Sequence, residues 1–298
     1  MNDRPRVSVG LPVFNGERFL AEAVDSILAQ TFEDFELIIS DNASTDRTEE
    51  ISRAYADKDE RVRYVRNREN LGAAYNYNQT FHLSSGTYFK WAAHDDALRP
   101  QFLERCVEIL DRDPSAVIAY PRWKAIDETS RRQDYEYASW DVTSPVPHRR
   151  FRSAMVMAGL GSVPIFGLIR SEVLQRTELQ PAYAHGDHVL LSELSLYGTF
   201  HEIPEELQLH RWHAGRYSLI SPTGERSGWW APASTRTSSA PIETLRLAVL
   251  PVILRGMGHL GAVARAPIGW RGKVRCDAEF VRWGCWKVWQ RLQRRFEG

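Results

Sequence analysis

The chain has 298 residues with 38 Lys and Arg and 38 Asp and Glu, so its formal net charge is zero. This balance gives no overall attraction to polyanions, and we expect no nucleic-acid partner. The three widely spaced cysteines predict neither a disulfide framework nor a paired metal site. No apolar run reaches the roughly 20 residues that span a bilayer, and the N-terminus lacks a signal-peptide core. We therefore expect a cytoplasmic protein.

The first 120 residues alternate between predicted strands and predicted helices. Apolar runs predict strands at residues 7–14, 35–40, 61–65, 87–91 and 116–120, and helical spacing of apolar residues follows the first of them. Strands that alternate with helices in this way indicate a doubly wound, mostly parallel α/β sheet. Residues 122–152 are polar and lack such a pattern, so they predict a long loop over one side of the sheet.

The second half of the chain predicts two more strands and ends in helices. The strands are expected at residues 165–169 and 207–212, with a helix at 187–197 between them. Residues 215–240 are rich in Gly, Ser, Thr and Pro, which is typical of a linker. We therefore divide the chain into an α/β domain, residues 1–225, and a C-terminal extension of linker and amphipathic helices, residues 226–298.

The last predicted helix, residues 275–296, combines tryptophans with arginines. A basic helix of this kind can lie in the interface of a membrane. It can equally pack its aromatic face on the domain and leave the arginines in water. We favour packing, because the helix should cover part of a core, and we keep peripheral membrane contact at the inner face as the alternative.

Polar residues follow three of the predicted strands. They are Asn15 and Glu17 after the first, Asp41 and Asn42 after the second, and Asp95 and Asp96 after the fourth. Ligands of parallel α/β sheets bind at this edge, and a divalent cation that carries phosphates suits such carboxylates. The alternative for the acidic pair is a solvated turn that caps the next helix. The glycine-rich phosphate loops of dinucleotide-binding and P-loop proteins are missing after the first strand.

Five motifs together resemble a known family. They are Leu11-Pro12-Val13-Phe14-Asn15-Gly16-Glu17, Ser26-Ile27-Leu28-Ala29-Gln30-Thr31, Ser40-Asp41-Asn42-Ala43-Ser44-Thr45-Asp46, Asn70-Leu71-Gly72, and His94-Asp95-Asp96 with Pro100. In this order they resemble the N-terminal half of family 2 glycosyltransferases, and the resemblance extends over about residues 6–215. It implies the GT-A fold, with a C-terminal helical extension here, and transfer with inversion at the sugar.

The resemblance also implies roles for single residues. Asp41 matches the carboxylate that reads the nucleotide base. Asp95 matches the metal ligand that ends the family's Asp-x-Asp motif, Asp96 matches a following acid, and Ala93 stands in place of the first Asp. A divalent metal, Mn²⁺ or Mg²⁺, is thus the expected cofactor. The nucleotide-sugar-binding residues implied are Pro12, Phe14, Glu17, Asp41, Asn42, Gly72, Asn78, His94 and Arg211.

Two later motifs supply the remaining chemistry. Gly186-Asp187 matches the family's acidic motif, which implies that Asp187 is the catalytic base for an acceptor hydroxyl. Without the resemblance, Asp187 would be interpreted as a helix N-cap. His210-Arg211-Trp212-His213 matches a basic motif, in which Arg211 would face the diphosphate and His213 would complete the metal shell.

These features predict an inverting, metal-dependent glycosyltransferase. Its partners would be a nucleotide-diphosphate sugar donor and a glycan or lipid-linked acceptor, in the synthesis of a cell-surface glycan or glycolipid. Two alternatives stay open, a nucleotidyltransferase and a non-catalytic protein that binds nucleotide sugars. The sequence gives neither the donor's sugar and base nor the acceptor.

Overall fold

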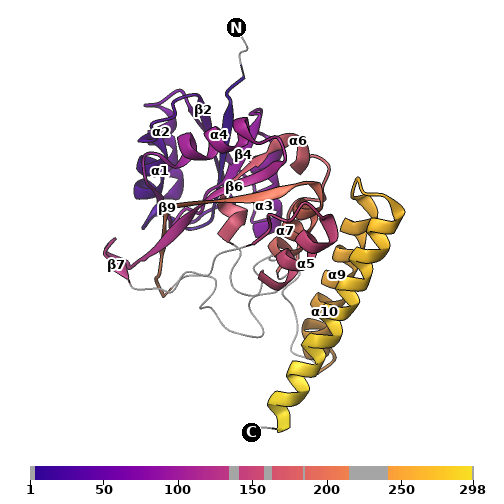
Figure 1. The fold of residues 1–298 in the computed structure, drawn as a ribbon. Helices are drawn as coiled ribbons and strands as arrows, with labels where there is room; N and C mark the ends of the chain where they lie inside the picture. Colours follow the sequence, from indigo (N-terminus) through magenta and orange to yellow (C-terminus); the bar gives the residue numbers. More distant parts are fainter. Residues whose placement is uncertain (1–3, 134–140, 158–162, 184, 215–240, 297–298) are drawn as a thin grey trace.

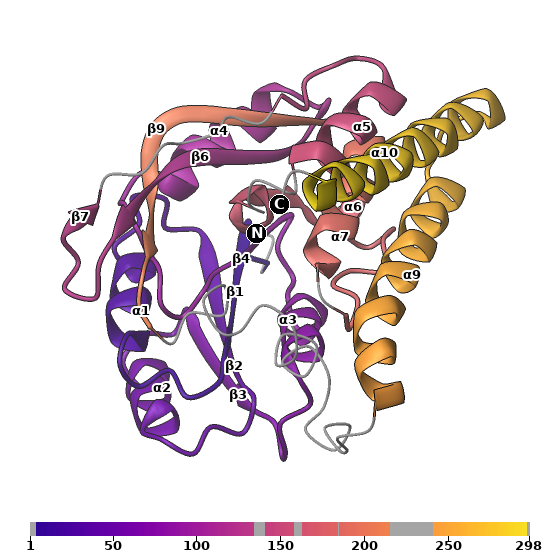
Figure 2. The ribbon, with the colours of Figure 1, turned by 90° about the horizontal axis from the view of Figure 1, so that it is seen from below.

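The protein is described here from a computed structural model, which covers residues 4–133, 141–157, 163–183, 185–214 and 241–296. One sheet of nine strands in the order β3-β2-β1-β4-β8-β6-β9-β5, with β7 beside β6, forms its centre, and Figures 1 and 2 show helices on both faces. The strands are β1 (Val7–Val13), β2 (Phe35–Asp41), β3 (Val62–Arg66), β4 (Tyr88–Trp91), β5 (Ala97–Leu98), β6 (Ala116–Ile126), β7 (Arg132–Gln133), β8 (Leu168–Arg170) and β9 (Thr199–Arg211). The helices are α1 (Leu20–Leu28), α2 (Thr48–Ala56), α3 (Ala73–His82), α4 (Phe102–Arg112), α5 (Pro147–Met157), a 3₁₀ turn at Val163–Phe166, α6 (Ser171–Leu174), α7 (Gly186–Tyr197), α9 (Pro241–Arg265) and α10 (Trp270–Phe296).

The N-terminal half of the sheet is parallel, as predicted. Strands β3, β2, β1 and β4 pair in register, with Val7 beside both Phe35 and Tyr88. Alternate residues of β1 are apolar and face a core that α1 and α4 complete. On the opposite face, Gly10 allows α3 to pack closely against β1, because a Cβ at this position would lie 2.4 Å from the Thr80 hydroxyl.

The second half of the sheet is mixed. Strand β8 runs antiparallel between β4 and β6, whereas β6 and β9 pair in parallel from Ala116 and Thr199 to Ile126 and Arg211. Six of the nine strands, β1 to β4, β6 and β9, therefore point in one direction. Their carboxyl ends meet at one edge of the sheet, where ligands of such folds bind.

Three boundaries predicted from the sequence were wrong. Strand β6 continues to Ile126 and α5 begins at Pro147, so residues 122–152 are not one long loop. Strand β9 begins at Thr199 and not at residue 207, and residues 163–166 form a 3₁₀ turn before β8. The polar stretches of β6 and β9 are strands because they pair with each other, a partnership that local propensity does not reveal.

The C-terminal helices α9 and α10 lie along one flank of the domain, beside α5 and α7 (Figures 1 and 2). A small core joins these four helices, formed by Phe151, Met155, Leu196, Val263, Ala266 and Cys276. No helix in the described ranges is long and apolar enough to cross a membrane. The predicted linker at 215–240 and the division at residue 225 lie outside the described residues.

Candidate active site

The loop after β1 is fastened to the loop after β2. The Asn15 amide, with φ 52°, donates to the Ser44 hydroxyl at 2.9 Å, and the Gly16 amide donates to the Thr48 hydroxyl at 2.8 Å. The carboxylate of Glu17 accepts the Arg47 amide at 3.1 Å. The loop predicted to lie beside the nucleoside is thus a rigid rim, on which the Phe14 side chain stays 39% exposed. Pro12 lies buried beneath this rim on β1, where it pairs with Ser40 of β2.

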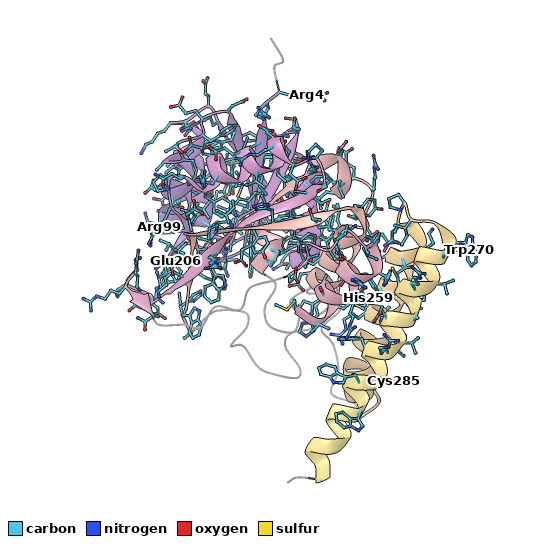
Figure 3. The ribbon with its side chains drawn as sticks, viewed as in Figure 1. Arg4, Arg99, Glu206, His259, Trp270 and Cys285 are labelled. Carbon is cyan, nitrogen blue, oxygen red and sulfur yellow. The ribbon has the colours of Figure 1, made fainter. Side chains whose placement is uncertain are left out.

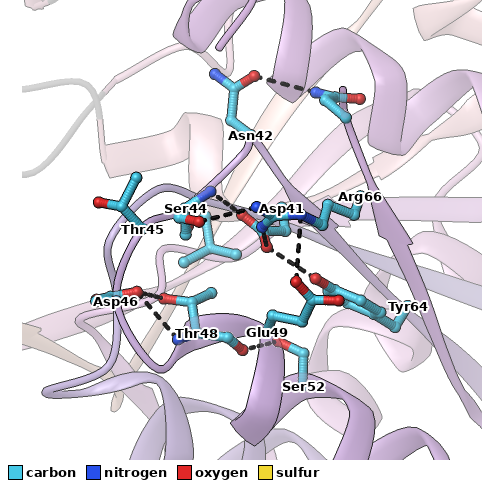
Figure 4. Close-up of polar contacts among 12 residues, drawn as sticks. Asp41, Asn42, Ser44, Thr45, Asp46, Thr48, Glu49, Ser52, Tyr64 and Arg66 are labelled. Atoms are coloured by element: carbon cyan, nitrogen blue, oxygen red, sulfur yellow. Dashed lines mark hydrogen bonds and ion pairs between the residues drawn. The ribbon is translucent and has the colours of Figure 1, made fainter. Parts of the chain in front are cut away.

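Asp41 ends β2 as a fully buried carboxylate with three hydrogen bonds (Figure 4). Its Oδ2 accepts the Tyr64 hydroxyl at 2.8 Å and Nη1 of Arg66 at 2.7 Å, and its Oδ1 accepts the Ser44 amide at 2.8 Å. The hydrogen bond to Asp41 raises the pKa of Arg66, while burial and the same carboxylate raise the pKa of Tyr64. The predicted base-reading residue is therefore held in one orientation, with both carboxylate oxygens engaged by donors of the protein.

The sequence analysis missed both of these partners of Asp41. Tyr64 and Arg66 are alternate residues of β3, so their side chains share a face, and Arg66 pairs with Asp41 across the ladder. The parallel register of β2 and β3 is the signal that would have identified them.

Asn42, predicted to contact the nucleotide, has its side-chain amide bonded within the protein. Its Nδ2 donates to Asn70 Oδ1 at 2.9 Å and to the Gly72 carbonyl at 3.2 Å. Its Oδ1 accepts Asn67 Nδ2 and the Leu71 amide, both at 3.0 Å. These contacts favour a structural role, in which Asn42 fixes the loop before α3. Gly72 ends that loop at φ 85°, a conformation suited to glycine.

Asn78 of α3 bridges to the segment that precedes α7. Its Nδ2 donates to the Gln180 carbonyl and its Oδ1 accepts the Gln180 amide, both at 2.9 Å. Asn78 therefore couples α3 to the chain that leads to Asp187, and these contacts favour positioning over direct contact with the donor. The ring of His94 lies over Gly16, where an added Cβ would approach His94 Cδ2 to 2.8 Å.

The acidic pair after β4 faces the end of β9, and its two carboxylates have different partners. Asp95 Oδ2 lies 2.9 Å from Nε2 of His213, and Asp96 Oδ2 lies 2.7 Å from Nδ1 of His210. Asp96 also accepts the Arg211 amide at 2.9 Å, and its side chain is only 5% exposed. Asp96, predicted as a metal ligand, thus has both oxygens engaged by β9, which favours a structural role.

Asp95 remains charged in this setting. Burial alone would raise its pKa, but the hydrogen bond from His213 and the nearby charges of His94 and His210 hold the pKa well below its usual range. Its side chain is 18% exposed and that of His213 is 10% exposed. The ring of His213 also packs on Phe19, with centroids 4.9 Å apart.

Arg211, predicted to face the diphosphate, has its guanidinium inside the protein. The residue is 1% exposed and stacks over Phe19 at 4.8 Å. Its Nε donates to the Asp95 carbonyl at 2.8 Å, and its Nη1 donates to the Asp127 carbonyl at 3.0 Å. Its Nη2 forms an ion pair with Glu22 at 2.7 Å. These contacts favour a role in fixing the turn that carries Asp95, and they leave His213 as the better-placed basic residue.

Asp95 and His213 are the pair that could hold a divalent cation. The described residues contain no group of three or more His, Cys, Asp or Glu side chains arranged for a metal. A carboxylate and an imidazole are suitable donors for Mn²⁺, and Mg²⁺ commonly takes one or two carboxylates and completes its shell with substrate phosphates and water. The pair therefore fits a metal that arrives with a diphosphate, not one in a closed protein cage.

Asp187 is the second residue of α7. The N-cap is His185, at φ 65°, so Asp187 does not cap the helix, although its Oδ1 accepts the His188 amide at 3.0 Å. Tyr77 lies on α3, the helix that Asn78 links to the segment before α7. Burial raises the pKa of its hydroxyl, and the charges of Asp95, Asp96 and Asp187 raise it further. Tyr77 was not among the site residues predicted from the sequence.

Comparison with protein families gives one match, to the model described as "Glycosyl transferase family 2", over residues 8–176. This segment is more than half of the chain. The chain belongs to glycosyl transferase family 2. The matched residues include β1 except for Val7, all strands from β2 to β8, and every predicted site residue before Asp187.

Curated proteins named as glycosyltransferases align with parts of the chain. An uncharacterized glycosyltransferase of Rickettsia typhi is 38% identical over 127 residues, 42% of this chain and 39% of the relative. One of Haemophilus influenzae is 28% identical over 234 residues, 74% of this chain and 69% of the relative. The chain thus spans well under two thirds of the length of the Rickettsia relative.

Solved structures of glycosyltransferases share the fold. TarS of S. aureus, residues 1–349 in complex with UDP-GlcNAc, superposes with a TM-score of 0.64 at 17% identity, covering 93% of this chain and 71% of that one. The mannosyltransferase PcManGT of Pyrobaculum calidifontis, with GDP-Man and Mn²⁺, gives a TM-score of 0.53 at 16% identity over 98% and 85%. These likenesses confirm the predicted GT-A type of α/β fold with C-terminal helices.

Proposed function

We propose that the protein is an inverting glycosyltransferase that moves a sugar from a nucleotide diphosphate to an acceptor hydroxyl. The observation that carries this proposal is the pairing of Asp95 with His213 at 2.9 Å, at the edge where the carboxyl ends of the parallel strands meet. Such a displacement needs two carboxylates. One, Asp95, would hold the metal at the diphosphate, and the other, Asp187, would take the proton of the acceptor hydroxyl.

Donor binding begins at the rim between the first two loops. The base would lie along the fixed loop after β1, near Phe14 and Asp41, whose carboxylate has one lone pair left beside its three bonds to accept a ring N–H of the base. The diphosphate would extend toward Asp95 and His213. A divalent metal bound there would neutralise charge on the diphosphate as it leaves.

The transfer step requires removal of one proton. Asp187 would accept the proton of the acceptor hydroxyl as its oxygen attacks the anomeric carbon. The bond between that carbon and the diphosphate oxygen breaks on the opposite side, so the configuration inverts. His213, beside Asp95, would stabilise the negative charge on the departing diphosphate.

We propose a glycan or lipid-linked acceptor and a role in the synthesis of a cell-surface glycan or glycolipid. Helix α7, which carries Asp187, is also the helix on which α9 packs, so the acceptor side of the site adjoins the C-terminal helices. We accordingly place the protein in the cytoplasm, with peripheral contact at the inner face of the membrane.

The proposal is tested by thermal unfolding with UDP, GDP and dTDP, each with and without Mn²⁺, and with the three nucleosides as controls. A ligand at about 100 times its dissociation constant stabilises the native state by roughly 2.7 kcal/mol. We expect one diphosphate to raise the melting temperature when Mn²⁺ is present, and its nucleoside to have little effect. Absence of any response to the three diphosphates would contradict the proposed donor site.

A further inference from the structure

Helix α10 exposes an apolar stripe along its length. The stripe consists of residues spaced four or three apart, which places them on one side of a helix. Its members are all exposed, and they are Trp270, Val274, Ala278, Val281, Cys285 and Trp289. Four of them are large and remain 55–71% exposed. Figure 3 shows Trp270 pointing away from the domain, so the stripe is not part of the core that α10 shares with α5.

Helix α9 carries a second stripe of the same kind. Ile253, Met257, Leu260 and Ala264 recur at the same spacing and are exposed, the first three by 52%, 63% and 47%. The side of α9 that packs on the domain carries other residues, among them His259, Ala262 and Val263, each at most 2% exposed. Both helices are therefore apolar on the side that packs and on a side that does not.

Charge is concentrated in the same two helices. Residues 241–296 contain eleven Lys and Arg and three Asp and Glu, a formal charge of +8, so the rest of the neutral chain carries −8. On α10 the exposed residues beside the stripe include Arg271, Arg275 and Arg282. An apolar stripe that basic side chains flank is the pattern of a helix lying in the interface of an anionic bilayer.

Helix α9 packs tightly against α7 and the segment before it. Gly258 of α9 meets α7 so closely that an added Cβ would lie 2.3 Å from the Tyr183 hydroxyl and 3.0 Å from Val189 Cγ1. Arg265 donates to the buried carboxylate of Glu193, with Nε at 2.8 Å from Oε1 and Nη2 at 3.0 Å from Oε2. Tyr183 and Val189 lie on either side of Asp187 in the chain, so α9 contacts the helix end that carries the proposed base.

We propose that the exposed stripes of α9 and α10 form a docking surface for an anionic lipid bilayer. The helices would lie in the headgroup region with their stripes toward the acyl chains and their arginines at the phosphates. If a second copy of this chain bound through this face, two segments 241–296, each with a formal charge of +8, would lie against each other. Their repulsion opposes such an association. The surface deepens the proposed function and rests on it, because α7 then presents Asp187 to an acceptor held in the membrane.

The test is co-sedimentation of the full chain with vesicles of phosphatidylcholine, with and without phosphatidylglycerol. We expect binding to the anionic vesicles and at least about tenfold less to the neutral ones. Val274→Glu with Val281→Glu, at positions 59% and 61% exposed, should weaken anionic binding at least about tenfold without changing the melting temperature. Met257→Glu with Leu260→Glu, which changes the stripe of α9, should weaken binding to anionic vesicles by a similar factor. The control is Lys58→Glu, an exposed site on the chain after α2 that gives the same two-unit change in net charge.

Three outcomes would overturn the proposal. The first is no binding of the parent protein to anionic vesicles, and the second is binding by both double variants that equals that of the parent protein. The third is a dimer in solution that the variants dissociate, because the face would then be a self-association surface. Vesicle binding needs no nucleotide sugar, whereas the donor test needs no lipid. Failure of one therefore does not imply failure of the other.

Discussion

His213 and Asp95 contact each other directly, with Nε2 of the histidine 2.9 Å from Oδ2 of the carboxylate. The two residues are far apart in the chain, and they meet because β9 returns along β6 to the end of β4. The next residue, Asp96, contacts His210 and the backbone of Arg211 instead. The acidic pair is thus divided between one carboxylate suited to a ligand and one that anchors β9.

This division predicts different defects for Asp95→Asn and Asp96→Asn. We expect Asp95→Asn to lower affinity for a nucleoside diphosphate in Mn²⁺ at least about tenfold, because the metal loses its carboxylate. Asp96→Asn should keep that affinity and lower the free energy of unfolding by about 1–3 kcal/mol, since buried bonds to β9 weaken. Titration calorimetry and urea unfolding separate the two effects. The same loss of affinity in both variants would show that Asp96 is also a ligand.

We predict that Arg211 contributes to the free energy of unfolding and does not contact the diphosphate. Arg211→Met leaves the carbonyls of Asp95 and Asp127 without its donors and should lower the free energy of unfolding by about 3 kcal/mol. Arg18 is a matched control, because its guanidinium also lies 4.8 Å from the Phe19 ring but its side chain is 61% exposed. Arg18→Met should change the unfolding free energy by less than about 1 kcal/mol. Equal effects would argue against the internal role of Arg211.

We predict that position 72 requires glycine because of its backbone conformation. At φ 85° before α3, Gly72→Ala should cost about 1–2 kcal/mol of unfolding free energy. Gly269, between α9 and α10, has no atom within 4 Å of an added Cβ and no positive φ, so Gly269→Ala should be nearly neutral. Chemical denaturation of both variants measures the difference. A neutral Gly72→Ala would mean that the loop relaxes to another conformation.

Because Lys90 is buried, we predict that the free energy of unfolding depends on pH. Lys90 is 1% exposed on β4, with its ammonium over the Phe102 ring and donating to the Phe166 carbonyl, and burial lowers its pKa from 10.5 to about 7. The unfolded state therefore binds more protons than the native state between about pH 7 and pH 10.5. Stability from this group rises with pH through that window, by up to about 1.4 kcal/mol per pH unit.

The measurement for Lys90 is a comparison with Lys90→Met. The difference in unfolding free energy between the variant and the parent should shrink as the pH rises from 7 to 10, because the penalty for the buried ammonium disappears. Groups other than Lys90 titrate in both proteins and cancel. A difference that is constant with pH would show that Lys90 keeps a near-normal pKa in the native state.

The sequence predicted the parallel half of the sheet well, because the strands around Val9, Leu37 and Phe89 are continuous apolar runs covered on both faces. It also identified family 2 and the residues at the strand ends. It did not predict the long pairing of β6 with β9, in which the strand continues through the charged residues Arg122 and Lys124 because they pair with β9.

The roles of site residues depend on the same long-range contacts. The motif around Arg211 indicates a basic residue near the site, but burial and the ion pair with Glu22 emerge only when β9 lies against α1. Tyr77 lies on α3, and no local sequence pattern marks it as a site residue. Whether Asn42 and Asn78 contact the donor stays a prediction, since their amides are bonded within the protein.

The central claim is that Asp187 accepts the proton of the attacking hydroxyl, and hydrolysis of the bound nucleotide sugar tests it most directly. Water can replace the acceptor, so release of the nucleoside diphosphate in Mn²⁺ needs no knowledge of the acceptor. Asp187→Asn should slow this release at least about 100-fold and leave nucleotide affinity unchanged. The control is Glu172→Gln, the same chemical change at an exposed residue of α6. Wild-type release by Asp187→Asn would contradict the proposed base and the mechanism built on it.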